Sequence, residues 1–186
     1  MSAADGRKRV FLACFPEASA RAALVRWQRR VLARCRARGL RPVAPAALHV
    51  TLLFLGDRDA AEVEGLLAAT RVVPAAAPPF LVGLGALRLL PSTRRPRVLA
   101  AELDSGGALE ALAAAARTAA SAVGIDVDPR PFLPHLTLAR LRPGSASLEA
   151  VPPPGPLAFG HVGLYESLLA ASGARYRALW RAPLAG

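Results

Sequence analysis

The order of secondary-structure elements predicts an α+β fold with two pseudo-symmetric lobes, each an antiparallel sheet with helices on its outside. In the first half of the 186-residue chain, a strand, a helix, a His-x-Thr strand and a second helix follow one another, and a helix and a His-x-Thr strand recur in the second half. The two histidines, His49 and His135, lie 86 residues apart, as one motif per lobe would require. We therefore expect one bilobal domain over residues 1–186, with one His-x-Thr strand from each lobe facing a central cleft.

The first half of the chain alternates between strand-like and helix-like hydrophobic patterns, and glycine or proline separates the segments. The expected elements, in order, are a strand at 9–15, a helix at 19–38, the first His-x-Thr strand at 48–55 and a short helix at 60–69. The long helix is amphipathic, with Leu24, Trp27 and Val31 on one side and arginines on the other. Gly39 stands where a C-terminal cap of this helix is expected.

In the second half, proline-rich connections separate the elements, because proline interrupts both helices and strand ladders. These connections are residues 74–79, 91–96 and 151–156. The expected elements are strands at 80–89 and 97–103, an alanine-rich helix at 107–123, the second His-x-Thr strand at 134–141, and last strands at 157–166 and 174–180. Gly124 follows the alanine-rich segment and ends the helix.

The paired His-x-Thr motifs carry the candidate chemistry. They are His49 with Thr51 and His135 with Thr137, in a chain with only three histidines and five threonines. In a β-strand, residues i and i+2 lie on the same face and residue i+1 points the other way. Each histidine should therefore share a polar face with its threonine, while the residue between them packs into the core.

Two imidazoles that face each other suit phosphodiester cleavage. Imidazole titrates near neutral pH, so one histidine can take a proton from water while the other gives one to the leaving oxygen. Hydroxyl groups beside them, from Thr51 and Thr137, can donate hydrogen bonds to the non-bridging phosphate oxygens. The third histidine, His161, has no threonine two positions later, and we assign it no role.

We expect neither a metal nor another cofactor. The chain has no clustered set of carboxylates and histidines, no GxxxxGK[ST] phosphate loop and no GxSxG elbow. Its two cysteines, Cys14 and Cys35, lack CxxC spacing and are expected to be buried, reduced thiols. No apolar run reaches the roughly 18 to 20 residues of a spanning helix, and no signal-peptide pattern is present, so we expect a cytoplasmic protein with no membrane partner.

The formal net charge of +11 favours a polyanionic partner, because arginines neutralise phosphates and steer their approach. However, every basic residue except Lys8 is an arginine, and alanine, glycine and proline are also abundant. This composition is typical of GC-rich coding. Charge alone therefore does not distinguish a nucleic-acid-binding surface from an ordinary solvated one.

Four segments carry a family resemblance. They are RVFLA at 9–13, LHVTLLFLG at 48–56, RPFLPHLTLAR at 130–140 and LYES at 164–167. In this order they resemble the bacterial and archaeal RNA 2′,3′-cyclic phosphodiesterases, also called 2′-5′ RNA ligases, of the two-histidine (2H) phosphoesterase superfamily. The resemblance covers nearly the whole chain. It is specific because it includes the residues that flank the two His-x-Thr motifs, in segments 48–56 and 130–140.

The resemblance implies hydrolysis of a terminal RNA 2′,3′-cyclic phosphate to a 2′-phosphomonoester without a metal. It implies that His49 is the proton donor to the leaving 3′ oxygen and that His135 is the proton acceptor that activates water. Thr51 and Thr137 would hold the phosphate. The implied partners are RNA ends that carry the cyclic phosphate, including tRNA fragments, and we expect the chain to be a monomer.

Two further residues follow from the resemblance. Arg140 resembles the family arginine that closes the second motif. Regular strand alternation would place it on the face opposite His135, so a contact with phosphate requires the strand to end or bulge there. Tyr165 could stack on a base or, as is commoner for an aromatic residue in a strand, could pack in the core.

Three other interpretations remain open from the sequence. The same site run in reverse would join a 2′,3′-cyclic phosphate to a 5′-hydroxyl, which is 2′-5′ RNA ligation. A second enzymatic interpretation is a phosphodiesterase that acts on small nucleotide-derived cyclic phosphates. The third is a non-catalytic RNA-binding module, which would bind RNA with or without a cyclic end and turn nothing over.

Overall fold

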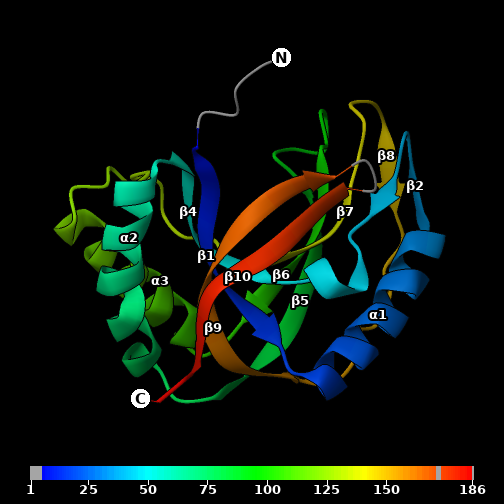
Figure 1. Ribbon diagram of the computed structural model, residues 1–186. Helices are drawn as coiled ribbons and strands as arrows, with labels where there is room; N and C mark the ends of the chain where they lie inside the picture. Colours follow the sequence, from blue (N-terminus) through cyan, green and yellow to red (C-terminus); the bar gives the residue numbers. More distant parts are fainter. Residues whose placement is uncertain (1–5, 171–172, 186) are drawn as a thin grey trace.

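One antiparallel sheet runs through the protein, as Figure 1 shows for the computed structural model of the chain, which describes residues 6–170 and 173–185. The order of its strands is β3-β7-β6-β5-β9-β1-β4, and β10 pairs with β9. The strands are β1 (Lys8–Pro16), β3 (Arg41–Pro42), β4 (Val50–Arg58), β5 (Phe80–Leu90), β6 (Val98–Asp104), β7 (His135–Arg140), β9 (Leu157–Ala170) and β10 (Gly173–Pro183). The predicted mixture of helices with an antiparallel sheet is confirmed.

Strand β5 joins two halves of this sheet. Its first residues, 80–82, pair with β9, whereas residues 83–90 pair with β6. One half therefore contains β9, β1 and β4 with the first His-x-Thr motif, and the other contains β6 and β7 with the second. β4 and β7 come into contact where the two halves meet, which brings the two motifs together.

Helices pack against the sheet, and the first and the third of them connect its two halves. They are α1 (Ala18–Ala33), α2 (Ala60–Ala69) and α3 (Ala108–Ala122), with short 3-10 helices η1 (Pro45–Ala47) and η2 (Thr70–Ala76). α1 follows β1 in the chain, yet its buried Gln28 donates a hydrogen bond to the Leu138 carbonyl of β7 at 2.8 Å. α3 follows β6, yet it packs against β4 and η2. Each of these two helices thus ties one half of the sheet to the other (Figure 1).

The first helix is shorter than the sequence predicts. We expected it to reach Arg38 with Gly39 as its cap, but it ends at Ala33. The next residues form β2 (Cys35–Ala37), which pairs with β8 (Ala146–Leu148) in a separate two-stranded sheet. Because β8 lies more than a hundred residues away in the chain, the hydrophobic spacing around residues 35–37 cannot indicate that they form a strand. Gly39 serves instead in the turn between β2 and β3, with φ of +58°.

The other expected elements agree with the structure within a few residues at their ends, except that η2 occupies part of the expected connection at 74–79 and β9 and β10 are longer than predicted.

Cys14 is buried and Cys35 is half-buried, and both are free thiols. No helix in the described part of the chain is long and apolar enough to cross a membrane.

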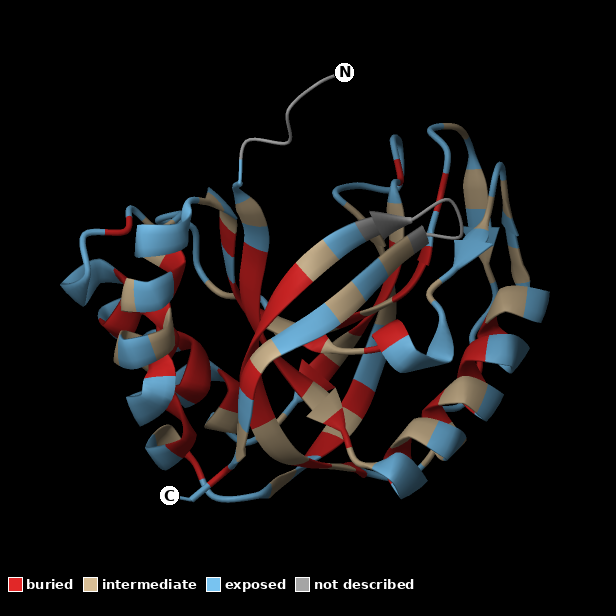
Figure 2. Ribbon diagram, viewed as in Figure 1, coloured by how far each residue is buried: buried red, intermediate tan, exposed pale blue. Residues whose placement is uncertain are grey.

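The hydrophobic core lies between the sheet and the helices, where Figure 2 shows the buried residues in red. Strands β1, β4, β7 and β9 and the inner sides of α1 and α3 contribute most of it, with Trp27, Phe159 and Leu12 among its largest fully buried side chains. A second, smaller cluster of buried aromatic residues, formed around Phe11 and Tyr165, packs on the other side of β1. The polar residues of the two motifs lie on that side.

Candidate active site

The two histidines are held in the same way. Nδ1 of His49 lies 2.7 Å from the Ala47 carbonyl, and Nδ1 of His135 lies 2.8 Å from the Leu133 carbonyl, in both cases two residues earlier in the chain. A carbonyl oxygen can only accept a hydrogen bond, so Nδ1 carries the proton in each ring. Nε2 is therefore the nitrogen that remains for proton transfer in both histidines. His49 lies just before β4 and not inside it, because η1 ends at Ala47 and places the carbonyl there.

A β-bulge follows each His-x-Thr motif. In β4, Thr51 pairs with Ala13 and Leu53 with Leu12, so Leu52 has no partner residue of its own on β1. In β7 the register shifts in the same way, between the pairs that Thr137 and Ala139 make with β6, and Leu138 is the extra residue. A bulge of this kind reverses the direction in which the following side chains point.

The bulge in β7 brings Arg140 back to the face of Thr137. Leu138 and Ala139 are both buried and Arg140 is exposed, which breaks the regular alternation after Thr137. The carbonyl of the extra residue, Leu138, accepts hydrogen bonds from the Val43 amide at 2.9 Å and from Gln28. The sequence predicts that Arg140 can contact phosphate only if this strand ends or bulges at that point. The structure shows such a bulge.

Four of the predicted site residues line a single cavity of about 470 Å³. They are His49, Thr51, Thr137 and Arg140. His135 lines an adjoining cavity of about 520 Å³, which shares Thr51 and Phe54 with the first. The two motifs therefore contribute to one continuous region at the junction of the sheet halves.

Aromatic rings surround His49. The ring centroids of Phe11 and Phe15 lie 5.2 Å and 5.3 Å from that of His49, and Tyr176 packs edge-on at 4.9 Å. Tyr176, from β10, also lines the cavity, and we did not predict it from the sequence. It lies close to His49 only because β10, β9, β1 and β4 are neighbours in the sheet.

This environment lowers the pKa of His49 from 6.5 to about 4. Burial is the largest cause, since it disfavours the charged imidazolium, and electrostatic repulsion from Arg140, and from His135 when that ring is protonated, acts in the same direction. The hydrogen bond to Ala47 opposes them. In the free protein at neutral pH, His49 is therefore neutral, and its Nε2 lies 3.0 Å from the Thr51 hydroxyl oxygen, from which it accepts a hydrogen bond.

Two residues singled out in the sequence lie elsewhere. Tyr165 is buried and packs with Phe15 at 4.7 Å and Phe11 at 5.9 Å, so it supports the aromatic cluster and does not line either cavity of the two motifs. His161, to which we assigned no role, lies 2.9 Å from Glu17. Both residues border a separate cavity of about 410 Å³.

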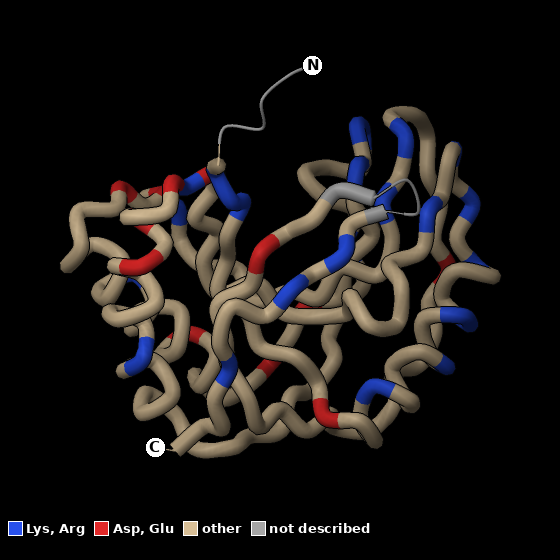
Figure 3. The backbone as a smooth tube through the Cα atoms, viewed as in Figure 1, with Lys and Arg blue, Asp and Glu red and all other residues tan. Residues whose placement is uncertain are grey.

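The surroundings of the site are rich in arginine. Figure 3 shows basic residues along the side of the molecule that carries α1, β2 and β8, and on β10, whereas acidic residues gather near the start of α2. Within residues 6–170 and 173–185, no group of three or more His, Cys, Asp or Glu side chains is arranged to hold a metal ion.

Comparison with known proteins gives a consistent result. The family described as "LigT like Phosphoesterase" matches residues 15–100 and 103–176. A Thermus thermophilus protein named RNA 2′,3′-cyclic phosphodiesterase is 37% identical over 151 residues, which are 78% of this chain and 73% of that protein. A Bacillus subtilis protein of the same name is 32% identical over 108 residues, 58% of this chain and 59% of the relative.

Solved structures agree with the sequence comparisons. Escherichia coli LigT complexed with 3′-AMP superposes with a TM-score of 0.75 at 30% identity, over 97% of this chain and 99% of that one. A solved structure from Thermus thermophilus also superposes with a TM-score of 0.75, at 32% identity, over 95% of this chain and 97% of its own. The likeness therefore extends over nearly the whole fold, and both motifs lie within the residues that the family matches.

Proposed function

This chain belongs to the family of LigT-like phosphoesterases, and from that membership we propose that it hydrolyses the 2′,3′-cyclic phosphate at the end of an RNA to a 2′-phosphomonoester. The observation that best supports this proposal is the matched pair of histidines, each with Nδ1 bound to a carbonyl and Nε2 left for proton transfer. An acid and a base are both needed to replace an ester oxygen with water. The names of the relatives supply the substrate class.

In the proposed mechanism, Nε2 of His135 takes the proton from the attacking water. Nε2 of His49 gives a proton to the leaving 3′ oxygen as the bond from phosphorus to that oxygen breaks. The 2′ oxygen keeps its bond to phosphorus, so the product is the 2′-phosphomonoester. At the end of the reaction His135 carries the proton that it took from water and His49 has lost its own, and exchange with solvent restores both.

The proton donor must be charged before the reaction, although His49 is neutral in the free protein because its pKa lies near 4. A bound phosphodiester brings a negative charge next to the ring, and a nearby opposite charge raises the pKa of imidazole. Substrate binding would also offset the repulsion from Arg140, since the guanidinium and the phosphate attract each other. We therefore infer that His49 becomes protonated as the substrate binds.

Thr51, Thr137 and Arg140 supply the donors that this phosphate needs. All three line the cavity with His49, and the bulge in β7 turns Arg140 toward it. Hydrogen bonds from two hydroxyl groups and a guanidinium would fix the phosphorus for in-line attack and stabilise the charge that develops on its oxygens.

The decisive experiment uses an oligonucleotide that ends in a 2′,3′-cyclic phosphate. We expect the purified protein to convert it to a single product, and phosphorus NMR to identify that product as the 2′-phosphate. A product that is mainly the 3′-phosphate would show that the substrate binds with its two ester oxygens exchanged. Absence of turnover, with the folded protein verified by circular dichroism, would refute the proposal.

A comparison of substrates addresses the RNA part of the proposal. We expect a lower KM for the oligonucleotide than for a 2′,3′-cyclic mononucleotide, because the arginine-rich side of the molecule can contact additional phosphates. Equal kcat/KM values for the two substrates would instead favour a small cyclic nucleotide as the substrate.

A further inference from the structure

The connection between α3 and β7 presents the carbonyl that orients the second histidine. Residues 125–134 of this connection form neither helix nor strand. Near its end, the Leu133 carbonyl accepts the hydrogen bond from Nδ1 of His135. We propose that Arg117, on α3, is a positioning residue for His135, because its guanidinium fixes the connection that presents this carbonyl. The inference rests on the proposed phosphodiesterase function, in which His135 is the base.

Proline limits the ways in which this connection can be anchored. Its last part has the sequence DPRPFLP, in which Pro129, Pro131 and Pro134 are three of seven residues. A proline nitrogen carries no hydrogen, so these residues cannot donate a hydrogen bond to a neighbouring element. The carbonyl groups must therefore supply much of the anchoring, and the donors must come from elsewhere in the fold.

Arg117 supplies such donors. Its Nη1 donates to the Asp128 carbonyl and its Nη2 donates to the Arg130 carbonyl at 2.5 Å. These carbonyls belong to the residues on either side of Pro129, so one planar guanidinium bridges the turn at this proline. The turn is closed from its other side, because Arg130 Nε donates to the Asp128 carboxylate at 2.8 Å.

The charges of this turn do not change while the histidines gain or lose protons. The hydrogen bond from the Arg130 side chain is the largest cause that lowers the pKa of Asp128 from 3.8 to about 2, and the positive charge of Arg117 acts in the same direction. Asp128 is therefore ionised throughout the range in which imidazole titrates. The contacts of Arg117 thus persist through the proposed reaction.

A short and stiff stretch joins the anchored turn to the second motif. Pro131 and Pro134 each restrict the backbone angle φ, and the Pro134 carbonyl accepts a hydrogen bond from the Leu103 amide of β6 at 3.1 Å. The Leu133 carbonyl lies between this contact and those of Arg117. The Leu133 residue is 51% exposed, so side-chain packing contributes little to its position. The two anchors must therefore fix the carbonyl.

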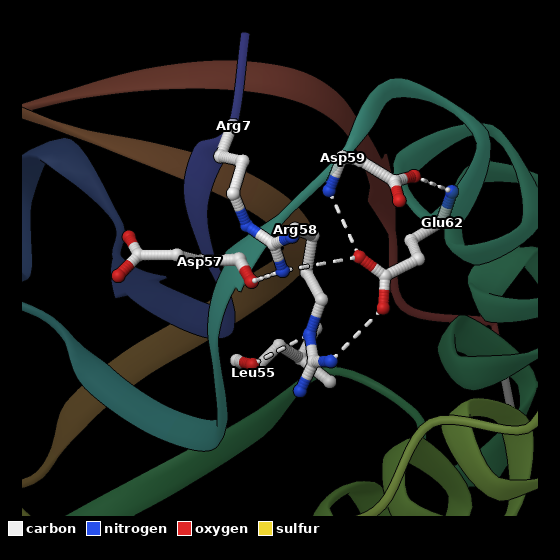
Figure 4. A network of polar contacts seen from close by, with 6 residues as sticks. All are labelled: Arg7, Leu55, Asp57, Arg58, Asp59 and Glu62. Carbon is white, nitrogen blue, oxygen red and sulfur yellow. Dashed lines mark hydrogen bonds and ion pairs between the residues drawn. The ribbon is translucent and has the colours of Figure 1, made fainter. Parts of the chain in front are cut away.

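The first motif is supported differently. There the 3-10 helix η1 ends at Ala47 and presents its carbonyl to His49. The arginine network of β4 lies after that motif, where Arg58 Nε donates to the Leu55 carbonyl at 2.8 Å (Figure 4). Loss of the Arg117 side chain should therefore misdirect one histidine of the pair and leave His49 in place.

The kinetic test compares Arg117→Ala with Arg95→Ala, which removes an exposed arginine from the connection between β5 and β6. We expect Arg117→Ala to lower kcat on the cyclic-phosphate oligonucleotide about 10- to 100-fold with little change in KM, because the base is misdirected and the phosphate is still held. Arg117→Lys should recover only part of kcat, since an ammonium group is not a planar fork. Arg95→Ala should leave kcat and KM unchanged.

A free guanidinium ion can replace the missing side chain. Arg117 borders the 520 Å³ cavity of His135, so the space left in Arg117→Ala is open to small solutes. We expect a non-denaturing concentration of guanidinium chloride to raise kcat of Arg117→Ala toward that of the natural protein. Sodium chloride at the same concentration should not. Such a rescue distinguishes a lost local contact from a general loss of stability.

Long-range proton–nitrogen NMR of the imidazole rings tests the positioning of His135 without turnover. In alkaline buffer, where imidazole is neutral, we expect His49 and His135 of the natural protein both to carry the proton on Nδ1. In Arg117→Ala, His135 should show a mixture of the two tautomers, because its carbonyl partner is no longer fixed. His49 should keep its proton on Nδ1.

The outcomes separate this inference from the proposed function. If His135 keeps its tautomer in Arg117→Ala, Arg117 does not position it and the proposal is wrong, whatever the effect on kcat. In an active protein, an unchanged kcat in Arg117→Ala, with its fold verified by circular dichroism, would also reject it. If the natural protein does not cleave the substrate, the proposed function is wrong, but the change of tautomer in Arg117→Ala would still support the positioning role.

Discussion

The Thr51 hydroxyl oxygen lies 3.0 Å from Nε2 of His49, the ring nitrogen that the Ala47 carbonyl leaves free. Nε2 of the neutral ring has a lone pair, so the hydroxyl donates to it. Once Nε2 is protonated this lone pair is gone, and the hydroxyl is free to donate to a phosphate oxygen. Protonation of His49 and binding of phosphate by Thr51 should therefore be coupled.

Replacement of either histidine should remove most of the activity. We expect His49→Ala and His135→Ala each to lower kcat by about 10²- to 10⁴-fold, which is the usual contribution of a general acid or base. Steady-state kinetics on the cyclic-phosphate oligonucleotide measures this, with His161→Ala as the control, because His161 pairs with Glu17 in a different cavity. Near-full rates in both folded variants would show that the site is assigned wrongly.

Removal of a threonine hydroxyl should have a smaller effect. We expect Thr51→Ala and Thr137→Ala each to reduce kcat/KM by about 10- to 150-fold, because a hydrogen bond to a charged acceptor contributes about 1.5 to 3 kcal/mol. Thr51→Ser keeps the hydroxyl and should recover most of the rate. A serine variant as slow as the alanine variant would indicate that the methyl group matters and the hydroxyl does not.

Arg140 should act through charge and through its forked geometry. We expect Arg140→Ala to reduce kcat/KM about 10- to 150-fold and Arg140→Lys to recover only part of this, since lysine cannot donate two parallel hydrogen bonds. Arg36→Ala, on β2, is the matched control for the loss of one exposed arginine. If Arg36→Ala were equally slow, the effect would come from overall charge and not from a contact in the cavity.

The lowered pKa of His49 should make stability depend on pH. Between about pH 4 and 6.5 the unfolded chain binds a proton at this residue that the folded protein does not, so the free energy of unfolding rises with pH across this window. His49→Gln removes this contribution. We therefore expect the stability of the natural protein relative to His49→Gln to increase from pH 4 to 6.5, as measured by urea denaturation. If the difference in free energy of unfolding between the natural protein and His49→Gln did not change with pH, this result would contradict the lowered pKa of His49.

Activity should not depend on a divalent metal ion, because two histidines, two threonines and an arginine can supply every proton and charge that the proposed reaction needs. We expect equal rates in EDTA and in buffer with added Mg²⁺. Loss of activity in EDTA that is restored by a divalent ion would count against the two-histidine mechanism.

Local pattern in the sequence accounted for the main elements. The helix at 60–69 and the core strands were predicted closely because their hydrophobic periodicity and their glycine or proline borders are local signals. Strands β2, β3 and β8 were not predicted. Each is two or three residues long and is stabilised by a partner far away in the chain, so no periodic pattern can develop within it.

The His-x-Thr spacing identifies which residues carry the proposed chemistry, since local strand geometry places each histidine beside its threonine. The directions of the side chains beyond the threonines depend instead on tertiary contacts. Leu52 and Leu138 are ordinary apolar residues, and nothing local marks them as the extra residues in bulges. The register with β1 and β6, together with the Gln28 hydrogen bond to the Leu138 carbonyl, makes them so. Because a shift of one residue moves a side chain to the other face of a strand, these distant contacts direct Phe54 and Arg140 toward the site.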